Sequence, residues 1–577
     1  MNKKALQKLE LTWIGKGEEP KLEPRILIEN PDYSYGDTNA ENILIHGDNL
    51  LALKALEQDF EGIIKCIYID PPYNTGGAFE HYDDNLEHSI WLNLMYQRIG
   101  ILHKLLSKDG VFCIHLDDQE VFYAKIICDE LFGRDKFVTS IAVKSSTPSG
   151  LKTAHRNKTI IKQKDLILVY KKSESLVVNP QYAKRDKWDS HYSKYFDLET
   201  KTIHDLIDVL LEKNIISEKV SIKKLDFENK KFKSFYIKHC KNIFQTQPTM
   251  PDEYKELSKR NPNKIIEYVD NDGKVNYAQN GRRFVFLDNS LNVLDNGETD
   301  LGTLLCDFWS DIDFQNTQNE GHNSFPAGKK PEKLLNRILK LFTNEGDYVL
   351  DSFLGSGSTA AAALKLKRKF IGIELGEHAI SHCYPRLKNI VDGIDNSGIS
   401  EDTNWQGGSG FKFYTLAPSL LKQDKFGNWV ISEEYNPDML AAAMAKQEGF
   451  NYLPHEDKFW KQGNSSENDF IFTTTQFLTV ETIDSIQDDM KDGESVLICC
   501  KAFQKECKNK YSNITLKKIP QMLLDRCEFG KDDYSFNIVN LPIEQEEMET
   551  EEEIEASTES VQELRDKNEA DNQVKLF

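Results

Sequence analysis

The sequence predicts an α/β fold with a mostly parallel sheet. Two observations lead to this prediction. Short apolar runs rich in β-branched residues alternate with longer helical patterns, and this alternation occurs in two stretches, residues 41–172 and 304–415. Residues 173–303, which separate these stretches, are rich in Lys, Asn, Tyr and Phe and show no repeating strand-helix unit. We therefore expect one α/β core that is interrupted by an inserted domain.

Length and composition limit the class of protein. A chain of 577 residues exceeds what one hydrophobic core usually organises, which favours about two to four domains. The 39% hydrophobic and 29% charged residues, without a long apolar run, indicate a soluble globular protein and argue against a membrane role. Residues 1–10 have no apolar signal segment, so we expect a cytoplasmic protein. The ten cysteines lack metal-ligand spacing, and no metal site is expected.

The first half of the core follows an extended arm, residues 1–40, in which Pro and Gly interrupt any periodic pattern. Residues 63–69 contain four isoleucines, which favours a strand. Asp117 or Asp118 stands where a helix would begin, and Gly133 stands where it would end. The predicted elements are a strand at 43–45, a helix at 49–56, a strand at 63–69, a helix at 89–106, a strand at 111–116 and a helix ending near Gly133.

The alternation resumes in the second half of the core. An amphipathic pattern follows Pro331, and an alanine-rich helical pattern follows a glycine turn. The predicted elements are a helix at 331–342, a strand at 347–353, a helix at 358–367 and a strand at 369–375.

A third region follows the glycine-rich residues 407–410. Strand patterns at 470–473 and 496–499 flank a helix pattern at 480–490, which predicts a small C-terminal α/β domain. The last residues hold thirteen acidic and three basic side chains and cannot bury enough apolar surface to become ordered. The predicted divisions are an arm (1–40), a first core half (41–172), an insert (173–303), a second core half (304–415), a C-terminal domain (416–543) and a disordered acidic tail (544–577).

A glycine motif follows the strand predicted at 347–353. Gly355 permits a tight turn, and Gly357 lets a ligand approach the backbone closely. Glu374 ends the next predicted strand, where its carboxylate could hold both hydroxyls of a ribose. This pattern indicates an adenosine-type ligand, and it also fits a nucleotide-dependent oxidoreductase or a turn that serves packing alone. The motif lacks the Lys-Ser/Thr pair of a phosphate-binding P-loop.

A second motif, Asp70-Pro71-Pro72-Tyr73, ends the strand predicted at 63–69. Proline cannot continue a central strand, so the chain leaves the sheet at its carboxyl edge, where open α/β sheets bind ligands. Asp70 and the Pro71 carbonyl offer two acceptors to an aromatic amine such as adenine N6, and Tyr73 offers a flat face to a flipped base. Alone, this tetrapeptide would be better explained as a proline-capped strand end with an exposed tyrosine.

Together the D-P-P-Y and F-x-G-x-G motifs resemble the amino-methyltransferases of DNA modification. The resemblance implies a Rossmann-like S-adenosylmethionine-dependent methyltransferase core, with the catalytic motif first, as in the beta class, and a target-recognition domain in the insert. It implies catalytic roles for Asp70, Pro71, Pro72 and Tyr73. The residues that it implies at the cofactor, including those of the glycine motif, are Asp48, Lys329, Pro331, Asp351, Phe353, Gly355, Gly357, Thr359 and Glu374.

Residues 11–16, 23–27, 68–76 and 405–414 resemble the modification (Mod) subunits of type III restriction-modification systems. This resemblance implies an adenine-N6 methyltransferase that forms a homodimer, recognises double-stranded DNA and serves an ATP-dependent restriction (Res) subunit. The chain departs from it at Lys164-Asp165, where relatives often have His-Glu, so we assign that strand no catalytic role. Cytosine-N4 methylation and a non-catalytic DNA-specificity subunit remain the alternatives.

A basic run inside an acidic chain predicts contact with DNA. The net charge is -21, yet residues 134–172 hold ten basic and two acidic side chains. A solvated loop is the alternative. Residues 171–270 are nearly balanced, with twenty basic and sixteen acidic side chains, and no base-reading residue can be named there. The residues that we expect at the phosphates are Lys144, Lys152, Arg156, Lys158 and Lys162.

Overall fold

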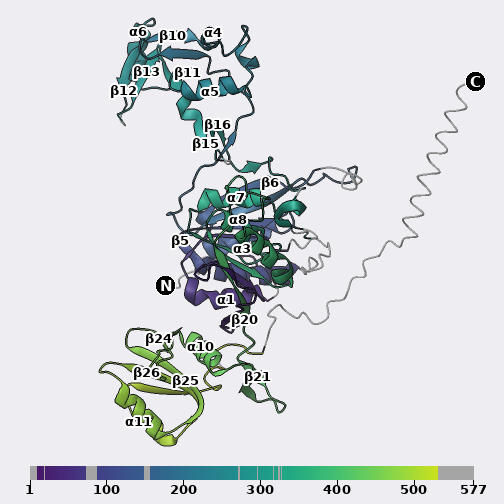
Figure 1. The fold of residues 1–577 in the computed structure, drawn as a ribbon, viewed down its shortest axis with the longest axis vertical. Helices are drawn as coiled ribbons and strands as arrows, with labels where there is room; N and C mark the ends of the chain where they lie inside the picture. Colours follow the sequence, from purple (N-terminus) through teal and green to yellow (C-terminus); the bar gives the residue numbers. More distant parts are fainter. Residues whose placement is uncertain are drawn as a thin grey trace, which may run out of the picture. The chain divides into compact units, whose positions relative to one another are not determined.

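The structure is a computed structural model of the chain, drawn as a ribbon in Figure 1. The chain divides into two compact units, residues 1–534 and 535–577, and the second unit, with the predicted tail, lies outside the described residues. None of the helices in the described ranges combines the length and the apolar character that crossing a bilayer requires. The described residues are 10–13, 15–17, 20–72, 88–147, 156–270, 273–294, 297–315, 317–322, 325, 328–524 and 526–530.

The core is built on one large sheet, whose strands within the described residues follow the order β1-β20-β3-β19-β18-β4-β5-β7-β6-β17. From β20 to β5 all neighbours run parallel, whereas β7 lies antiparallel between β5 and β6. This arrangement confirms the predicted α/β core with a mostly parallel sheet. The bounds are β1 (Leu27–Glu29), β2 (Tyr35–Gly36, paired with β20), β3 (Ile43–His46), β4 (Ile64–Ile69), β5 (Leu106–Leu116), β6 (Phe137–Lys144), β7 (Lys164–Lys171), β17 (Phe308–Trp309), β18 (Tyr348–Asp351), β19 (Lys369–Glu374) and β20 (Gly410–Leu416).

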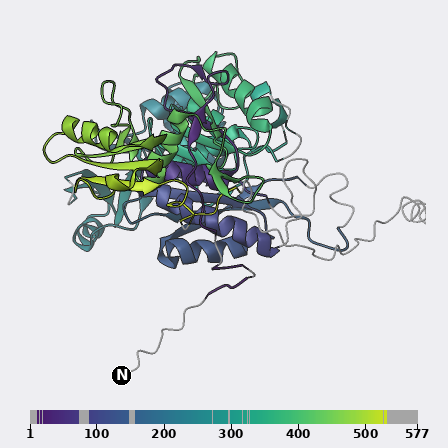
Figure 2. The ribbon, with the colours of Figure 1, turned by 90° about the horizontal axis from the view of Figure 1, so that it is seen from below.

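Helices cover both faces of this sheet because successive strand residues point to opposite sides. Tyr68 of β4 packs into one hydrophobic cluster with α7, α8 and α9, and its neighbour Ile67 packs into another with α1, α2 and α3. Figures 1 and 2 show the two sets of helices around the central strands. The bounds are α1 (Asn49–Phe60), α2 (His88–Leu105), α3 (Val121–Phe132), α7 (Glu332–Phe342), α8 (Ser358–Lys365) and α9 (Tyr384–Val391).

Two local predictions in the core are wrong. The predicted Asp117 or Asp118 cap is absent, since α3 begins at Val121 after Glu120, which makes no side-chain cap. Asp117 Oδ1 instead accepts a hydrogen bond from the Gln119 N–H at 3.0 Å, closing a turn before the helix. The strand predicted at 347–353 ends at Asp351, because the chain leaves the sheet two residues before the predicted end. The residues that follow are therefore available for the glycine turn.

The insert is antiparallel and has its own aromatic core. Its main sheet follows the order β10-β9-β11-β14-β13-β12, and a smaller sheet follows β15-β16-β8. Phe196, Phe244 and Phe284 are buried together, so much of the Phe and Tyr content of the segment forms its interior. The bounds are β8 (Tyr182–Lys184), β9 (Lys194–Asp197), β10 (Thr202–Asp205), α4 (Leu206–Glu212), α5 (Lys230–Lys238), β11 (Ile243–Gln247), α6 (Asp252–Arg260), β12 (Ile266–Val269), β13 (Val275–Gln279), β14 (Arg282–Phe286), β15 (Leu291–Val293) and β16 (Thr299–Leu304).

The C-terminal region contains a sheet in the order β23-β24-β25-β26-β27, in which β25, β26 and β27 run parallel. The strands predicted at 470–473 and 496–499 lie within β25 and β26, and the predicted helix is α11. A separate hairpin pairs β21 with β22. The bounds are β21 (Leu421–Gln423), β22 (Trp429–Ile431), α10 (Pro437–Glu448), β23 (Asn451–Tyr452), β24 (Gly463–Asn464), β25 (Asp469–Leu478), α11 (Val480–Asp489), β26 (Ser495–Phe503) and β27 (Ile514–Lys518).

Candidate active site

Four carboxylates gather where neighbouring parallel strands end. Asp351 is the last residue of β18, Glu374 is the last residue of β19, and Asp70 directly follows β4. Asp48 follows β3, whose His46 pairs in register with Glu374. Since β3, β19, β18 and β4 are consecutive in the sheet, their carboxyl ends lie along one edge. The two motifs, which are almost 300 residues apart in the sequence, therefore meet at this edge.

The glycine turn after β18 is fastened to the end of β19. Glu374 Oε2 accepts a hydrogen bond from the Gly355 N–H at 2.7 Å, and its Oε1 accepts one from the Gly376 N–H at 3.1 Å. Gly355 and Gly357 have φ values of 56° and 80°, in the left-handed region that favours glycine. In the described part of the chain, a Cβ added at Gly355 would come no closer than 3.9 Å to another heavy atom, Phe325 Cζ. Among the described residues, a side chain at Gly355 would thus meet only ordinary van der Waals contact, with the Phe325 ring.

Asp351 is buried and holds the beginning of the turn. Its Oδ1 accepts a hydrogen bond from the Phe353 N–H at 2.9 Å, and its Oδ2 accepts one from the Thr359 hydroxyl at 2.6 Å. Burial is the main cause that raises the pKa of Asp351 to about 7; the charges of Asp70 and Glu374 act in the same direction, and the hydrogen bonds from Thr359 and Phe353 oppose the rise. The structure therefore places three of the predicted cofactor residues in one hydrogen-bonded unit.

Asp48 caps α1 and joins a second group of contacts. Its Oδ1 accepts a hydrogen bond from the Leu51 N–H at 3.0 Å, and its Oδ2 lies 3.3 Å from Arg98 Nη2 of α2. Asn49 Nδ2 donates to the Ser352 carbonyl at 2.7 Å, which ties the loop after β3 to the loop after β18. Sequence reasoning missed Arg98, although a lone arginine within the apolar helix pattern was the available signal.

The proline motif is held by an indole and a lysine. Trp91 Nε1 donates to the Pro72 carbonyl at 2.8 Å, and Pro71 is buried. The Lys330 ammonium donates to Asp70 Oδ2 across 260 residues of sequence. Lys330 was missed by sequence reasoning, which selected its neighbour Lys329. Tyr73, the predicted stacking residue, lies outside the described residues.

Lys329 and Pro331 stand at the entrance to α7. Lys329 Nζ donates to the Glu320 carbonyl at 2.5 Å. Burial, and then the nearby Arg386 charge, lower the pKa of Lys329 to about 8. Pro331 occupies the N-cap of α7 with a φ of -67°. Both residues were predicted from the sequence. They flank Lys330 in the chain, and Lys330 contacts Asp70 of the site.

A buried ion network fixes α7 to the glycine turn. Glu332, the first residue of α7, contacts Lys365 of α8 at 2.7 Å and Arg386 of α9 at 2.8 Å, and all three side chains are fully buried. Arg386 Nη1 also donates to the Ser356 carbonyl at 3.0 Å. Because each charge depends on the others, the network sets the position of the segment before α7 relative to the turn.

Buried polar side chains from three neighbouring strands, β4, β5 and β7, lie next to one another. The Tyr68 hydroxyl lies 2.8 Å from His115 Nδ1, and His115 Nε2 lies 3.7 Å from Asp165 Oδ2. Burial opposes ionisation of Asp165, but the hydrogen bond and charge of His115, with Ser145 and Lys162, hold its pKa below the usual range. We predicted no catalytic role for the strand that contains Asp165, and the structure places this carboxylate on the wall of a cavity.

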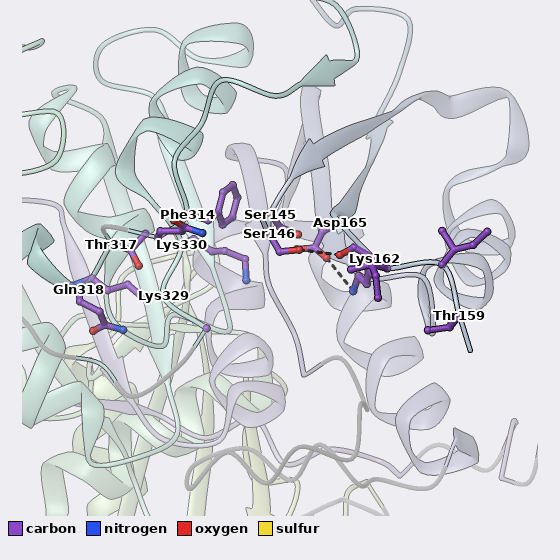
Figure 3. Close-up of a pocket in the computed structure, with 14 residues that line it drawn as sticks. Ser145, Ser146, Thr159, Lys162, Asp165, Phe314, Thr317, Gln318, Lys329 and Lys330 are labelled. Atoms are coloured by element: carbon purple, nitrogen blue, oxygen red, sulfur yellow. Dashed lines mark hydrogen bonds and ion pairs between the residues drawn. The ribbon is translucent and has the colours of Figure 1, made fainter. Parts of the chain in front are cut away.

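This cavity, of about 730 Å³, lies beside Lys330 and is shown in Figure 3. Its wall brings the segment before α7 together with the ends of β6 and β7. Phe314 provides an aromatic face there. The lining residues are Ser145, Ser146, Thr159, Ile160, Ile161, Lys162, Asp165, Phe314, Gln315, Thr317, Gln318, Gly328, Lys329 and Lys330.

The predicted DNA-contacting residues lie in different settings. Lys144, at the end of β6, is exposed, and so are Arg156 and Lys158. Lys162 lies 3.1 Å from Asp117 and 3.1 Å from Asp165, so nearby carboxylates offset its charge. Lys152 lies outside the described residues. Among the described members of the run that were predicted to contact DNA, Lys162 is therefore the one whose charge carboxylates offset.

Comparisons with known proteins agree with one another in naming DNA modification. Residues 64–384 match the N6_N4_Mtase family model, described as DNA methylase. The probable type III restriction-modification enzyme HindVI Mod subunit of Haemophilus influenzae is 35% identical over 413 residues, which cover 66% of this chain and 54% of the relative. The EcoPI Mod subunit of Escherichia phage P1 is 26% identical, with 63% and 62% covered. The chain thus spans between half and two thirds of these relatives.

Among solved structures, the cytosine-N4-specific PvuII DNA methyltransferase aligns with a TM-score of 0.31 and 13% identity, over 67% of this chain and 94% of that chain. The M1.HpyAVI-SAM complex aligns with a TM-score of 0.29 and 15% identity, over 60% and 98%. The family match covers more than half of the chain and includes both the proline motif and the glycine turn. This chain belongs to the DNA methylase family.

Proposed function

We propose that this chain transfers a methyl group from S-adenosyl-L-methionine to adenine N6 in double-stranded DNA. The main support for the proposal is that the proline motif and the glycine turn lie at the same edge of the sheet. Asp70-Pro71 follows β4, the glycine turn follows β18, and these strands are parallel neighbours. A donor bound at the turn and an acceptor amine bound at Asp70 would therefore lie side by side, as direct transfer requires.

The residues at the turn fit the proposed cofactor. Among the described residues, no heavy atom comes closer than 3.9 Å to a Cβ added at Gly355, and without a side chain there a nucleoside could approach the backbone beside Phe325. A carboxylate accepts about four hydrogen bonds, so the two amides that Glu374 binds are compatible with ribose hydroxyls as further donors. Asp48, Asp351, Phe353, Thr359, Lys329 and Pro331 complete the proposed binding residues. When bound, S-adenosyl-L-methionine supplies an electrophilic methyl group on a sulfonium.

The proline motif fits the proposed acceptor. Adenine N6 is a weak nucleophile because its lone pair is delocalised into the ring. Asp70 and the Pro71 carbonyl would accept its two N–H groups and favour a pyramidal nitrogen as the methyl group arrives. Trp91 holds the Pro72 carbonyl and so fixes the backbone of the motif. After transfer, the surplus proton of the amine leaves through Asp70 or solvent.

The base must leave the duplex to reach this edge. The cavity beside Lys330 is large enough for a purine, and Phe314 lines it. In the proposal the exposed Lys144, Arg156 and Lys158, with Lys152 and Lys162, contact DNA phosphates, and Tyr73 stacks on the flipped base. The insert, residues 173–303, serves as the target-recognition domain.

The similarity to the HindVI and EcoPI Mod subunits supports a wider assignment. We infer that the chain is the Mod subunit of a type III restriction-modification system, acts as a homodimer in the cytoplasm and supplies DNA specificity to a Res subunit.

Mass analysis of modified bases tests the activity. The full chain is expressed in a host without adenine methylation, and the host DNA is digested to nucleosides. We expect N6-methyladenine in the DNA of cells that express the wild-type chain. Asp70→Ala should reduce methyl transfer by at least about 100-fold, because an acceptor for the amine is lost, while S-adenosylmethionine still binds. N4-methylcytosine instead of N6-methyladenine, or full activity of Asp70→Ala, would contradict the proposal.

A further inference from the structure

The Lys330 side chain contacts the carboxylate of Asp70, which accepts the adenine amine in the proposed reaction. Its ammonium donates to Asp70 Oδ2, and the two side chains are only 11% and 18% exposed. A carboxylate accepts at two oxygens, so a cation on Oδ2 is compatible with an amine on Oδ1. The contact therefore constrains the Asp70 carboxylate at one of its two oxygens.

The charges around Asp70 explain why a cation is placed there. Asp351 and Glu374, at the ends of the neighbouring strands, are each 3% exposed. The charges of Asp70 and Glu374 both raise the pKa of Asp351, so both carboxylates lie close enough to act on it electrostatically. Like charges repel strongly where water is excluded, and a nearby cation offsets this repulsion. Lys330 supplies positive charge at Asp70, and the Lys330 side chain also lines the cavity.

The backbone of Lys330 is fixed on both sides. Before it, Lys329 donates to the Glu320 carbonyl. After it, Pro331 begins α7, and Glu332 is locked to Lys365 and Arg386 in the buried ion network. A side chain on such a segment can hold its partner in one orientation. Lys329 and Lys330 therefore have separate partners, although they are neighbours in the sequence.

We propose that Lys330 is a positioning residue that holds the Asp70 carboxylate in the orientation in which it accepts the adenine amine. The inference rests on the proposed function, since it assigns Asp70 to that amine. Lys330 acts through Asp70 and contacts neither the methyl group nor the cofactor. Because Lys330 also lines the cavity of Figure 3, the carboxylate is oriented where the base would enter.

Kinetics of four full-length proteins test this role: wild type, Lys330→Met, Lys330→Arg and the control Lys333→Met. The control removes a nearby lysine whose side chain is 48% exposed and lies 3.9 Å from Asp311. Methyl transfer to unmethylated plasmid DNA gives kcat and KM, and calorimetry gives the affinity for S-adenosylmethionine. Thermal melting reports folding of each variant.

Lys330→Met should lower kcat by about 100-fold, because a misplaced catalytic group costs that much, with KM and cofactor affinity changed less than about threefold. Lys330→Arg should recover most of the activity, since it keeps a cation that can bind a carboxylate. Lys333→Met should match the wild type. If Lys330→Met does not fold, Lys330→Gln, which retains a donor on a neutral side chain, replaces it.

Two results would contradict the role of Lys330 without contradicting the proposed function. The first is a wild-type kcat in Lys330→Met, and the second is a loss of cofactor affinity that accounts for the fall in kcat. In both, the wild type is active and Asp70→Ala is inactive, so the proposed function stands. A wild-type protein that transfers no methyl group to DNA contradicts the proposed function itself.

Discussion

Asp351 is a buried carboxylate whose ionisation is disfavoured by its surroundings. It is 3% exposed, and its oxygens accept hydrogen bonds from the Phe353 amide and the Thr359 hydroxyl. Burial raises its pKa to about 7, with Asp70 and Glu374 contributing in the same direction. The protonated form is therefore favoured in the folded protein relative to the unfolded chain.

The pH dependence of stability follows from this shift. Between about pH 4 and 7 the unfolded chain releases the Asp351 proton while the folded protein keeps it, so stability falls as pH rises through this window. Relative to Asp351→Asn, the wild type without cofactor should lose about 4 kcal/mol of unfolding free energy from pH 4 to 7. Denaturant melts of both proteins at several pH values measure this difference. Parallel curves for the two proteins would contradict it.

The glycine turn depends on backbone geometry more than on side chains. Gly355 stands between β18 and α8 with a φ of 56°, and a Cβ added there would meet only Phe325 Cζ, at 3.9 Å, among the described residues. Gly346, in the turn before β18, has a φ of 86° and no heavy atom within 4 Å of an added Cβ among the described residues. The two glycines share a left-handed backbone, but only Gly355 stands at the proposed cofactor site.

Alanine at each position separates backbone strain from ligand exclusion. Gly355→Ala and Gly346→Ala should each lose about 1 kcal/mol of unfolding free energy, because an L side chain is strained in this conformation. Only Gly355→Ala should weaken S-adenosylmethionine binding, by about tenfold, because its Cβ enters the space beside the turn. Calorimetry and thermal melting measure the two effects. Equal cofactor affinity in both variants would show that the cofactor does not approach Gly355.

Charge is distributed unevenly over the whole molecule. The chain carries a net charge of -21, while residues 134–172 are strongly basic. Within that run Lys144 and Lys158 are exposed, whereas Lys162 lies close to Asp117 and Asp165. An acidic protein that binds DNA must concentrate its phosphate contacts in such a region, because the rest of its surface is repelled by the duplex.

The salt dependence of DNA binding identifies the phosphate contacts. Replacing Lys144 or Lys158 with Ala should weaken binding and reduce the slope of log affinity against log salt by about one each. Lys162→Ala should change the slope less, because carboxylates already offset its charge. Lys458→Ala, which removes a lysine of the C-terminal region paired with Asp489 at 2.9 Å, is the control. Fluorescence anisotropy over a range of salt gives the slopes, and identical slopes in all variants would exclude the basic run.

Local patterns predicted most elements of the core. The four isoleucines of residues 63–69 identified β4, and the alanine-rich pattern after Gly357 identified α8, because burial on a sheet imposes a recognisable periodicity. The Asp117 prediction failed because an aspartate before a helix can equally close a turn. The sequence patterns of the two motifs were enough to identify Asp70, Gly355 and Glu374 as candidate site residues.

By itself, the sequence determined the α/β class, the split of the core and the two motifs, since each of these depends on residues close together in the chain. The tertiary structure alone decided that Lys330 contacts Asp70, that Arg98 contacts Asp48 and that Asp165 reaches the cavity. These pairings join residues that are distant in the chain, and they depend on the order of strands in the sheet. Strand order is set by packing of the whole core, which no local pattern records.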